Sequence, residues 1–493
     1  TTTIYEKGAE LIRMLELLLG KENFFRGINL YIKTFDGIAA TTEDLLNSLI
    51  KGAFLDKKYC PFDINRFLNW YYISGTPKVY INQSWDPENS ILNVSFHQKL
   101  NSEANNKNIE MVIPILYSCY SRGKGLKPIV EDNLLILDEN IKNLQINTLP
   151  GDKEAPVLSI FRGFSAPVLW ESDLSIDDYL FLFLNDNDYF SRWDAGQFLM
   201  REIIKNRICN KENYSLENSF IYAIQQLIQS LESNDPFFLA TLLTIPGFAE
   251  VESLFEKVDP INIYRESLNF QVLIGNKILR TLKIIAEKLL VNINHEWPKG
   301  KGERKLLGTI WTYLTLVGDR NVQKNCVKFI SYPSMTIARA ALDALKPLDS
   351  NHTEEASNLF YNLWKDNPVV LDSWFSYEAS RPNKKGIDVI EGLLSHPKFD
   401  WKAPNAIRAV LGGFSQNIEL FHSLDGQGYL FFADKLIDLD KINPITASRM
   451  VKIFSKWKTY VDENKEGMYK SILKINRANI SPNTREVVEL ILK

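Results

Sequence analysis

Residues 1–72 carry apolar side chains at the three- and four-residue spacing of amphipathic helices. Leu11, Leu15 and Leu18 share one stripe, and Gly20 is suited to end the helix that carries them. Three further helices are predicted, with starts near Glu22, Thr41 and Asp63. A run of helices with no sheet of its own predicts the helical end of a larger domain.

The pattern changes at Ser74-Gly75-Thr76-Pro77, and residues 73–170 read as short strands. Leu92, Val94 and Phe96 alternate with polar residues, which is the period of a half-buried strand. Similar runs begin at Val79, Met111, Leu134 and Val157, separated by polar or Gly/Pro-rich loops. This segment predicts a small antiparallel β-sandwich.

Residues 171–493 are almost entirely helical in pattern. Many helices of ordinary length follow one another, joined by short turns that contain Pro or Asn, and no strict sequence period recurs. A long series of paired helices favours a superhelical stack over a single bundle. The predicted fold class is therefore a multidomain α protein with a small β domain.

Composition and charge exclude several function classes. The 493 residues include 57 basic and 60 acidic residues, a net charge of −3 that gives no electrostatic footprint for nucleic acid. No apolar run approaches the length that spans a membrane. Four scattered cysteines predict reduced thiols and a cytoplasmic location. The first ten residues lack the pattern of a signal peptide and a Met, so we expect a longer protein around this chain.

The chain shows no complete catalytic motif of its own. Its five histidines lie too far apart in sequence for any local pair to chelate a metal, so we predict no metal ligands here. His295-Glu296 superficially resembles the start of a zinc-binding H-E-x-x-H helix, but Lys299 stands where the second His is needed. The residues alone therefore predict a helical scaffold with a β domain.

A family resemblance changes this interpretation. The segment Ile4-Tyr5-Glu6-Lys7-Gly8-Ala9-Glu10-Leu11 resembles the tyrosine-bearing helix of M1-family zinc aminopeptidases of the bacterial aminopeptidase N (alanyl aminopeptidase) type. The likeness continues in order along the chain, through Phe35-Asp36-Gly37, Trp70-Tyr71, Ser74-Gly75-Thr76-Pro77, Phe164-Ser165-Ala166-Pro167-Val168, Phe190-Ser191-Arg192-Trp193-Asp194-Ala195, Ile407-Arg408, Asp425-Gly426-Gln427-Gly428-Tyr429 and Ala447-Ser448-Arg449.

The resemblance implies a domain organisation and a place in a larger enzyme. Residues 1–72 would be the C-terminal helices of a thermolysin-like catalytic domain, 73–170 the β-sandwich, and 171–493 the helical C-terminal domain. The family's G-x-M-E-N and H-E-x-x-H motifs are not found in this sequence. Zinc would therefore belong to the complete enzyme, and this chain alone would be inactive. The implied partners are peptide substrates and the remainder of its own catalytic domain.

The resemblance also assigns roles to three residues. Tyr5 matches the tyrosine that donates a hydrogen bond to the oxyanion of the tetrahedral intermediate, a role that suits a neutral phenol. Arg408 and Arg449 match arginines that line the substrate cavity, where a guanidinium can bind the carboxylate end of a peptide. The plainer alternatives are a frayed tyrosine near a chain end and interhelical salt bridges.

Two functions remain open from the sequence. One is removal of N-terminal amino acids from peptides, to which this chain would contribute the oxyanion-stabilising tyrosine and the walls of the substrate cavity. The other is a non-catalytic helical adaptor that binds a protein partner.

Overall fold

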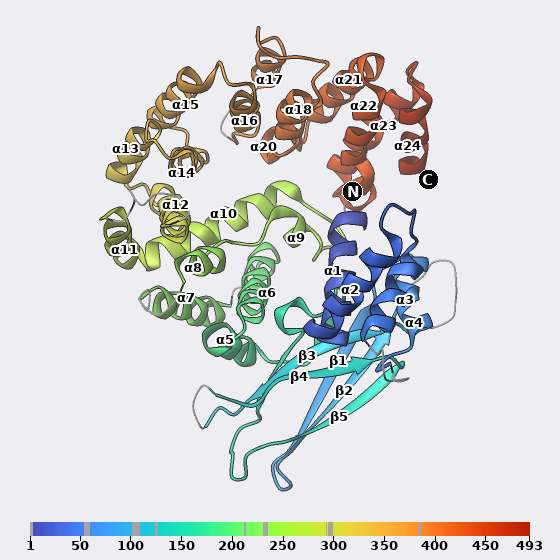
Figure 1. Cartoon of the computed structure of the whole chain (residues 1–493). Coiled ribbons are helices and arrows are strands. Elements are labelled where there is room, and N and C mark those ends of the chain that lie inside the picture. The colour runs from blue at the N-terminus through green and yellow to red at the C-terminus, as the bar shows by residue number, and fades with distance from the viewer. Residues whose placement is uncertain are drawn as a thin grey trace. The chain divides into compact units, whose positions relative to one another are not determined.

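A computed structural model describes residues 3–53, 60–100, 109–123, 127–211, 213–229, 235–291, 293, 299–382 and 386–493. His295 lies outside the described residues. The chain forms two compact units, residues 1–199 and 200–493. Figure 1 labels the helices and strands.

The first unit begins with the predicted helices. They are the π-helical turn η1 (Thr3–Lys7), α1 (Gly8–Leu19), α2 (Lys21–Phe35), α3 (Thr42–Ala53) and α4 (Ile64–Tyr72). Gly20 ends α1 with a φ of 78°, a backbone conformation that favours glycine. Asp63 caps α4, because its carboxylate accepts hydrogen bonds from the backbone N–H groups of Asn65 and Arg66. The sequence therefore predicted the stop at Gly20 and the start of α4 near Asp63 correctly.

The β-sandwich follows in the same unit. Its strands are β1 (Lys78–Asp86), β2 (Ile91–Lys99), β3 (Ile113–Tyr120), β4 (Pro128–Leu137), β5 (Ile141–Asn147), β6 (Val157–Ile160) and β7 (Leu169–Ser172), with the short helix η2 (Arg162–Phe164) between the last two. One sheet has the order β5-β2-β1-β7 and the other the order β4-β3-β6. All pairs are antiparallel except β1 with β7, which run parallel.

The core of the first unit is shared by the helices and the sandwich. Leu92, Val94 and Phe96 point into it as the alternation predicts. Strand β3 is buried along almost its whole length, and α1 packs against it. A single apolar cluster therefore runs from Leu11 on α1 to Val168 before β7.

The chain passes from the sandwich into helices. They are α5 (Ile176–Asn185), α6 (Tyr189–Ile208), α7 (Tyr214–Gln229), α8 (Pro236–Leu242), α9 (Phe248–Glu252), α10 (Pro260–Lys277), α11 (Leu279–Val291), α12 (Lys301–Leu316), α13 (Arg320–Phe329), α14 (Met335–Leu345), α15 (Asn351–Trp364), α16 (Pro368–Ala379) and α17 (Ile387–Leu394). The last ones are α18 (Pro404–Ile407), the π-helical η4 (Arg408–Gly412), α19 (Gly413–Ser415), α20 (Ile418–Phe421), α21 (Gln427–Ile442), α22 (Pro444–Val451), the 3₁₀-helix η5 (Lys452–Thr459), α23 (Asp462–Arg477) and α24 (Pro482–Leu492).

The second unit is a stack of helices in which sequence neighbours pack on each other. Helix α12 packs against α8, α11 and α14, and α21 packs against α22 and α23. Figure 1 shows the helices from α7 to α24 following one another as an arc. The predicted multidomain α fold with a small β domain is confirmed. The domain limits at 72/73 and 170/171 stay a prediction.

Candidate functional site

Tyr5 lies on a π-helical turn directly before α1. The turn η1 covers Thr3–Lys7, and the side chain of Tyr5 is 70% exposed. Within the described part of the chain, no hydrogen bond to the Tyr5 hydroxyl is found. Single π-helical turns are rare and occur often at functional sites. An exposed phenol with a free hydroxyl is able to donate to a molecule bound beside it.

The turn that carries Tyr5 is anchored by Lys7. The ammonium of Lys7 donates a hydrogen bond of 3.1 Å to the carbonyl oxygen of Gly75 and lies 5.6 Å from the centre of the Trp70 ring. Gly75 has a φ of 113°, which only glycine adopts without strain. The Ser74–Pro77 segment, expected to mark a domain passage only, therefore also holds the start of α1.

A second anchor lies further along α1, at Arg13. Its guanidinium donates to the carbonyl oxygens of Gly163 and Phe164, the latter at 3.2 Å. These two residues belong to the segment between β6 and β7. Helix α1 is thus attached through polar contacts to the segment before β1 and to the segment between β6 and β7.

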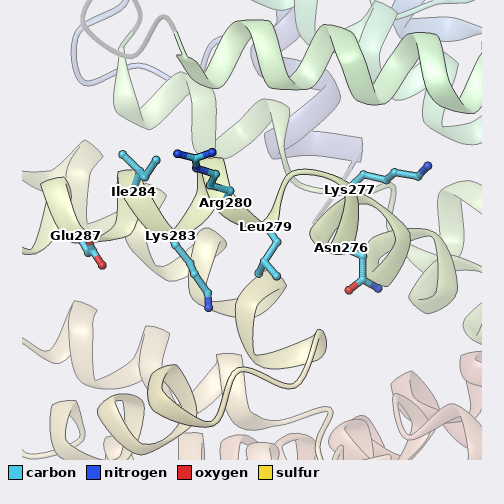
Figure 2. Close-up of a pocket in the computed structure, with 7 residues that line it drawn as sticks. All are labelled: Asn276, Lys277, Leu279, Arg280, Lys283, Ile284 and Glu287. Atoms are coloured by element: carbon cyan, nitrogen blue, oxygen red, sulfur yellow. The ribbon is translucent and has the colours of Figure 1, made fainter.

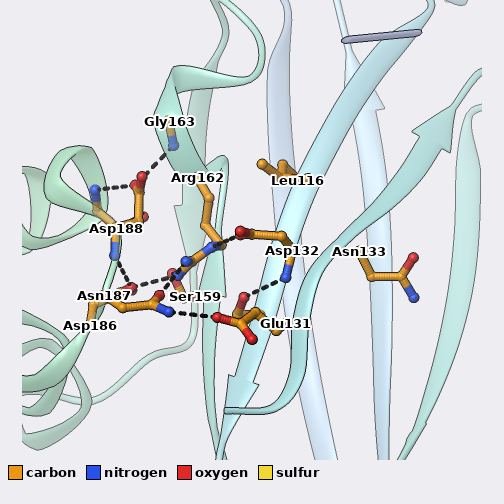
Figure 3. Close-up of polar contacts among 12 residues, drawn as sticks. Leu116, Glu131, Asp132, Asn133, Ser159, Arg162, Gly163, Asp186, Asn187 and Asp188 are labelled. Carbon is orange, nitrogen blue, oxygen red and sulfur yellow. Dashed lines mark hydrogen bonds and ion pairs between the residues drawn. The ribbon is translucent and has the colours of Figure 1, made fainter. Parts of the chain in front are cut away.

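The residue next to Gly163 is a buried arginine that ties three segments together. Arg162 donates to Asp132 on β4 at 2.7 Å and to Asp186 after α5 at 2.5 Å (Figure 3). Burial opposes its positive charge, but Asp186, Asp132 and Tyr120 together outweigh burial, and the pKa of Arg162 is raised. Burial, with a contribution from Asp186, also raises the pKa of the adjoining Tyr120 to about 12. The sequence gives no signal for this network, because arginine is rarely fully buried.

Arg408 is exposed and opens a second π-helical turn. The turn η4 interrupts the helical stretch between α18 and α19 and packs on α16. Its guanidinium donates to the side-chain oxygen of Asn405, one turn earlier. In the described residues Arg408 makes no ion pair, so the interhelical salt bridge considered above is not seen. Two of the three predicted site residues, Tyr5 and Arg408, therefore lie on π turns.

Arg449 is exposed near the end of α22. Among the residues that the structure describes, its guanidinium group has neither an ion-pair partner nor a hydrogen-bond partner. Arg408 and Arg449 lie on separate helices of the second unit, whereas Tyr5 belongs to the first. Both guanidinium groups are open to an anionic group from outside the chain.

A cavity of about 650 Å³ adjoins the junction of α10 and α11, with a basic lining (Figure 2). Lys277, Arg280 and Lys283 contribute positive charge, and Glu287 is the one acidic residue of the lining. Figure 2 shows Arg280 and Lys283 leaving α11 in different directions. Lys283 is paired with Asp319 at 2.6 Å. Arg280 was not singled out from the sequence, since a lone basic residue on a helix carries no signal.

Another cavity, of about 600 Å³, lies between α9, α20 and η5. His422 in its wall is buried, and burial lowers the pKa of this imidazole to about 3. The ring of Tyr460 stacks on His422, and the Tyr460 hydroxyl donates to Glu252 at 2.8 Å. Lys456 donates to the other oxygen of Glu252 at 2.6 Å. These polar groups satisfy one another, which is typical of a structural network.

The described residues do not fit a zinc ion. No three His, Cys, Asp or Glu side chains of the described segments gather in a group able to hold a metal. No described helix is both long and apolar enough to cross a bilayer.

Three family models match successive parts of the chain. A Peptidase family M1 domain matches residues 1–71, a domain of unknown function (DUF3458) with an Ig-like fold matches 75–173, and a domain of unknown function (DUF3458_C) with ARM repeats matches 176–493. The last model alone covers more than half of the chain. The chain belongs to the family of that helical domain, DUF3458_C, and its first 71 residues match the Peptidase family M1 domain.

Individual relatives agree with this membership. The chain is 30% identical to aminopeptidase N of Escherichia coli over 95% of its own length and 54% of the relative. It is 29% identical to aminopeptidase N of Caulobacter vibrioides over 100% of its own length and 56% of the relative. The chain thus spans about half the length of the curated relatives it matches.

The fold is also similar to that of a solved structure, the Legionella pneumophila aminopeptidase A in complex with aspartic acid. The TM-score is 0.85 at 27% identity, and the match covers 100% of this chain and 57% of the other. The M1 resemblance inferred from the sequence motifs is therefore confirmed, as is the helical superhelix. The roles of Tyr5, Arg408 and Arg449 stay predictions.

Proposed function

We propose that this chain is the C-terminal part of a zinc-dependent aminopeptidase that removes N-terminal amino acids from peptides. The observation that carries the proposal is the match to M1 peptidases along the whole chain, together with Tyr5 held free on a π turn. The comparisons do not favour the alternative of a non-catalytic adaptor, because the relatives that span the chain are aminopeptidases.

Tyr5 would stabilise the transition state of peptide hydrolysis. When the scissile carbonyl becomes tetrahedral, its oxygen gains negative charge, and a phenolic O–H aimed at that oxygen stabilises it. The exposure of Tyr5 and the absence of a described partner for its hydroxyl support this role. The zinc ion of the complete enzyme would be held outside the described residues, since these do not fit it.

Arg408 and Arg449 would bind the carboxylate end of a peptide substrate. Both are exposed, and neither is neutralised by a carboxylate of the described chain. A guanidinium binds a carboxylate through paired, charge-assisted hydrogen bonds. Their location on the helical unit supports a part for that unit in lining the substrate cavity.

The remainder of the catalytic domain would cover an apolar face of the first helices. Six large apolar side chains are exposed there: Ile4, Tyr5, Phe25, Ile32, Ile38 and Tyr72. Exposed apolar groups of this kind mark interaction surfaces. We also propose a cytoplasmic location, supported by four cysteines that form no disulfide. Cell fractionation tests the location.

The oxyanion role is tested with Tyr5→Phe in the complete enzyme. Loss of one donor is expected to lower kcat about 100- to 1,000-fold, with little change in KM. Tyr222→Phe is the matched control, because Tyr222 is a comparably exposed tyrosine, 62% against 70%, on α7. If Tyr5→Phe retains full kcat on a peptide substrate, Tyr5 does not stabilise the oxyanion.

The carboxylate role is tested with Arg449→Ala, again in the complete enzyme. KM for peptides is expected to rise about tenfold, which corresponds to one lost charge-assisted contact, while a chromogenic amino-acid amide without a carboxylate is unaffected. Arg320→Ala, an exposed arginine at the start of α13, serves as control. An equal effect on both substrates would contradict the assignment.

A further inference from the structure

The segment from Phe161, directly after β6, to the end of η2 at Phe164 holds the backbone in a strained form. Phe161 and Phe164 have φ values of 52° and 56°, and Gly163 between them has 56°. A bulky residue with positive φ is a true outlier, because its side chain crowds its own backbone there. Strain of this kind persists only where the surroundings enforce it, and it concentrates at functional sites.

The surroundings of this turn enforce it through Arg162. The guanidinium is buried and bonded to Asp132 and Asp186, as Figure 3 shows. Asp132 itself has a positive φ of 45°. The N–H of Gly163 donates to Asp188 at 2.9 Å. A buried ion-pair network on one side and a carboxylate on the other therefore fix the turn.

The strained turn aims two carbonyl oxygens at one side chain. The oxygens of Gly163 and Phe164 both accept hydrogen bonds from the guanidinium of Arg13 on α1. A Cβ added at Gly163 would lie 3.5 Å from Arg13 Nη2 and would also require a positive φ. The planar, rigid guanidinium contacts both oxygens at once, which fixes a direction as well as a distance.

Arg13 stands eight residues after Tyr5, on the helix that continues from the Tyr5 turn. At about 1.5 Å per residue, the two Cα atoms are separated by roughly 12 Å along the axis. A small rotation or slide of α1 would therefore move the phenol directly. Lys7 contacts Gly75 and the Trp70 ring at the very start of α1, and contacts at that one end leave rotation of the helix possible.

We propose that Arg13 is a positioning residue for Tyr5, held in register by the strained Phe161–Phe164 turn. This inference rests on the proposed function of Tyr5. The strained turn does not stabilise its own segment. It instead prevents rotation of α1, so that the phenol of Tyr5 is already oriented before substrate binds. Pre-organisation of a donor in this way acts on the transition state and leaves ground-state binding unchanged.

The experiment uses the complete enzyme with Arg13→Ala, Arg13→Lys and Arg26→Ala. Arg13→Ala is expected to lower kcat about tenfold at nearly constant KM, because misplacement by a fraction of an ångström weakens an aimed hydrogen bond. Arg13→Lys can still reach one carbonyl and is expected to recover part of the loss. Within the described residues, the side chain of Arg26 bonds to Asn23 on its own helix and to no other residue, so Arg26→Ala controls for loss of a surface charge.

A double-mutant cycle with Tyr5→Phe separates positioning from general stability. If Arg13 acts through Tyr5, Arg13→Ala causes no further loss in the Tyr5→Phe background. The same fold-loss in both backgrounds, or unchanged kcat in Arg13→Ala itself, overturns the positioning role. Full activity of Tyr5→Phe alone would instead refute the proposed function, so the two failures are distinguishable.

Discussion

Helices α2 and α3 approach each other closely at two glycines, Gly27 and Gly52. A larger residue at either position is therefore predicted to destabilise the first unit. A Cβ built on Gly27 would lie 2.5 Å from the Cα of Leu49 and 2.7 Å from its carbonyl oxygen. A Cβ on Gly52 would lie 2.5 Å from the Cα of Gly27. Both obstacles are backbone atoms, so no side-chain rotation relieves them. Gly27→Ala therefore forces the two helices apart.

The magnitude follows from the contact distance. Carbon atoms pack best at about 3.5–4.0 Å, so the helices must separate by roughly 1 Å. Overpacking of this kind lowers the free energy of unfolding by about 1–3 kcal/mol. The higher helix propensity of alanine raises it by at most about 1 kcal/mol. We expect a net loss of about 1–2 kcal/mol from the first unit. For a unit of this size that lowers its Tm by roughly 2–8 °C.

The assay is differential scanning calorimetry combined with amide hydrogen exchange of residues 21–53. Gly392→Ala is the matched control, because Gly392 lies inside α17 with no described atom within 4 Å of its would-be Cβ. That substitution is expected to stabilise the second unit by about 0.5–1 kcal/mol. If Gly27→Ala also raises Tm or leaves exchange in 21–53 unchanged, the close helix crossing is wrong.

Three further predictions concern stability. Burial holds the pKa of His422 near 3, so between about pH 3 and pH 6.5 the unfolded chain binds a proton at this imidazole that the folded chain does not bind. The free energy of unfolding should therefore rise by about 1.4 kcal/mol per pH unit in this range. Denaturant titrations of His422→Gln should lose that slope. Arg162→Met leaves Asp186 buried without its cation and should cost about 3–5 kcal/mol in thermal melts, with Arg162→Lys costing less. Ser175→Ala removes a capping box with Asp178 and should cost about 1 kcal/mol, seen as faster hydrogen exchange in α5, and an unchanged rate would contradict the cap.

The sequence pattern predicted the helices and the central strands well, because their burial has a clear period. Leu11, Leu15 and Leu18 are all buried on α1, as their spacing requires. Strand β5 was missed: it lies at a sheet edge, and of its seven residues only Ile146 is buried. Strand β7 was missed because it has only four residues, Leu169–Ser172. Edge and very short strands lack enough apolar positions to show a period.

The candidate site could be found only through resemblance. Nothing in the local pattern around Tyr5 distinguishes it from other tyrosines, and a π turn depends on packing that a single sequence does not display. The strain at Phe161 and Phe164 was equally hidden, since phenylalanine normally avoids positive φ. Both turns are held by contacts outside the local pattern: Lys7 with Gly75 in the first case, and Arg162 with Asp132 and Asp186 in the second.

The parallel pairing of β7 with β1 has a consequence for how the sandwich could be exchanged. Lys78 at the entry of β1 pairs with Leu169, and Ile81 pairs with Ser172 at the exit of β7. The chain therefore leaves the sandwich roughly 10 Å along the strand from where it came in. Such neighbouring ends would allow the sandwich to be replaced by recombination, if the replacement keeps the buried residues that share a core with the helices.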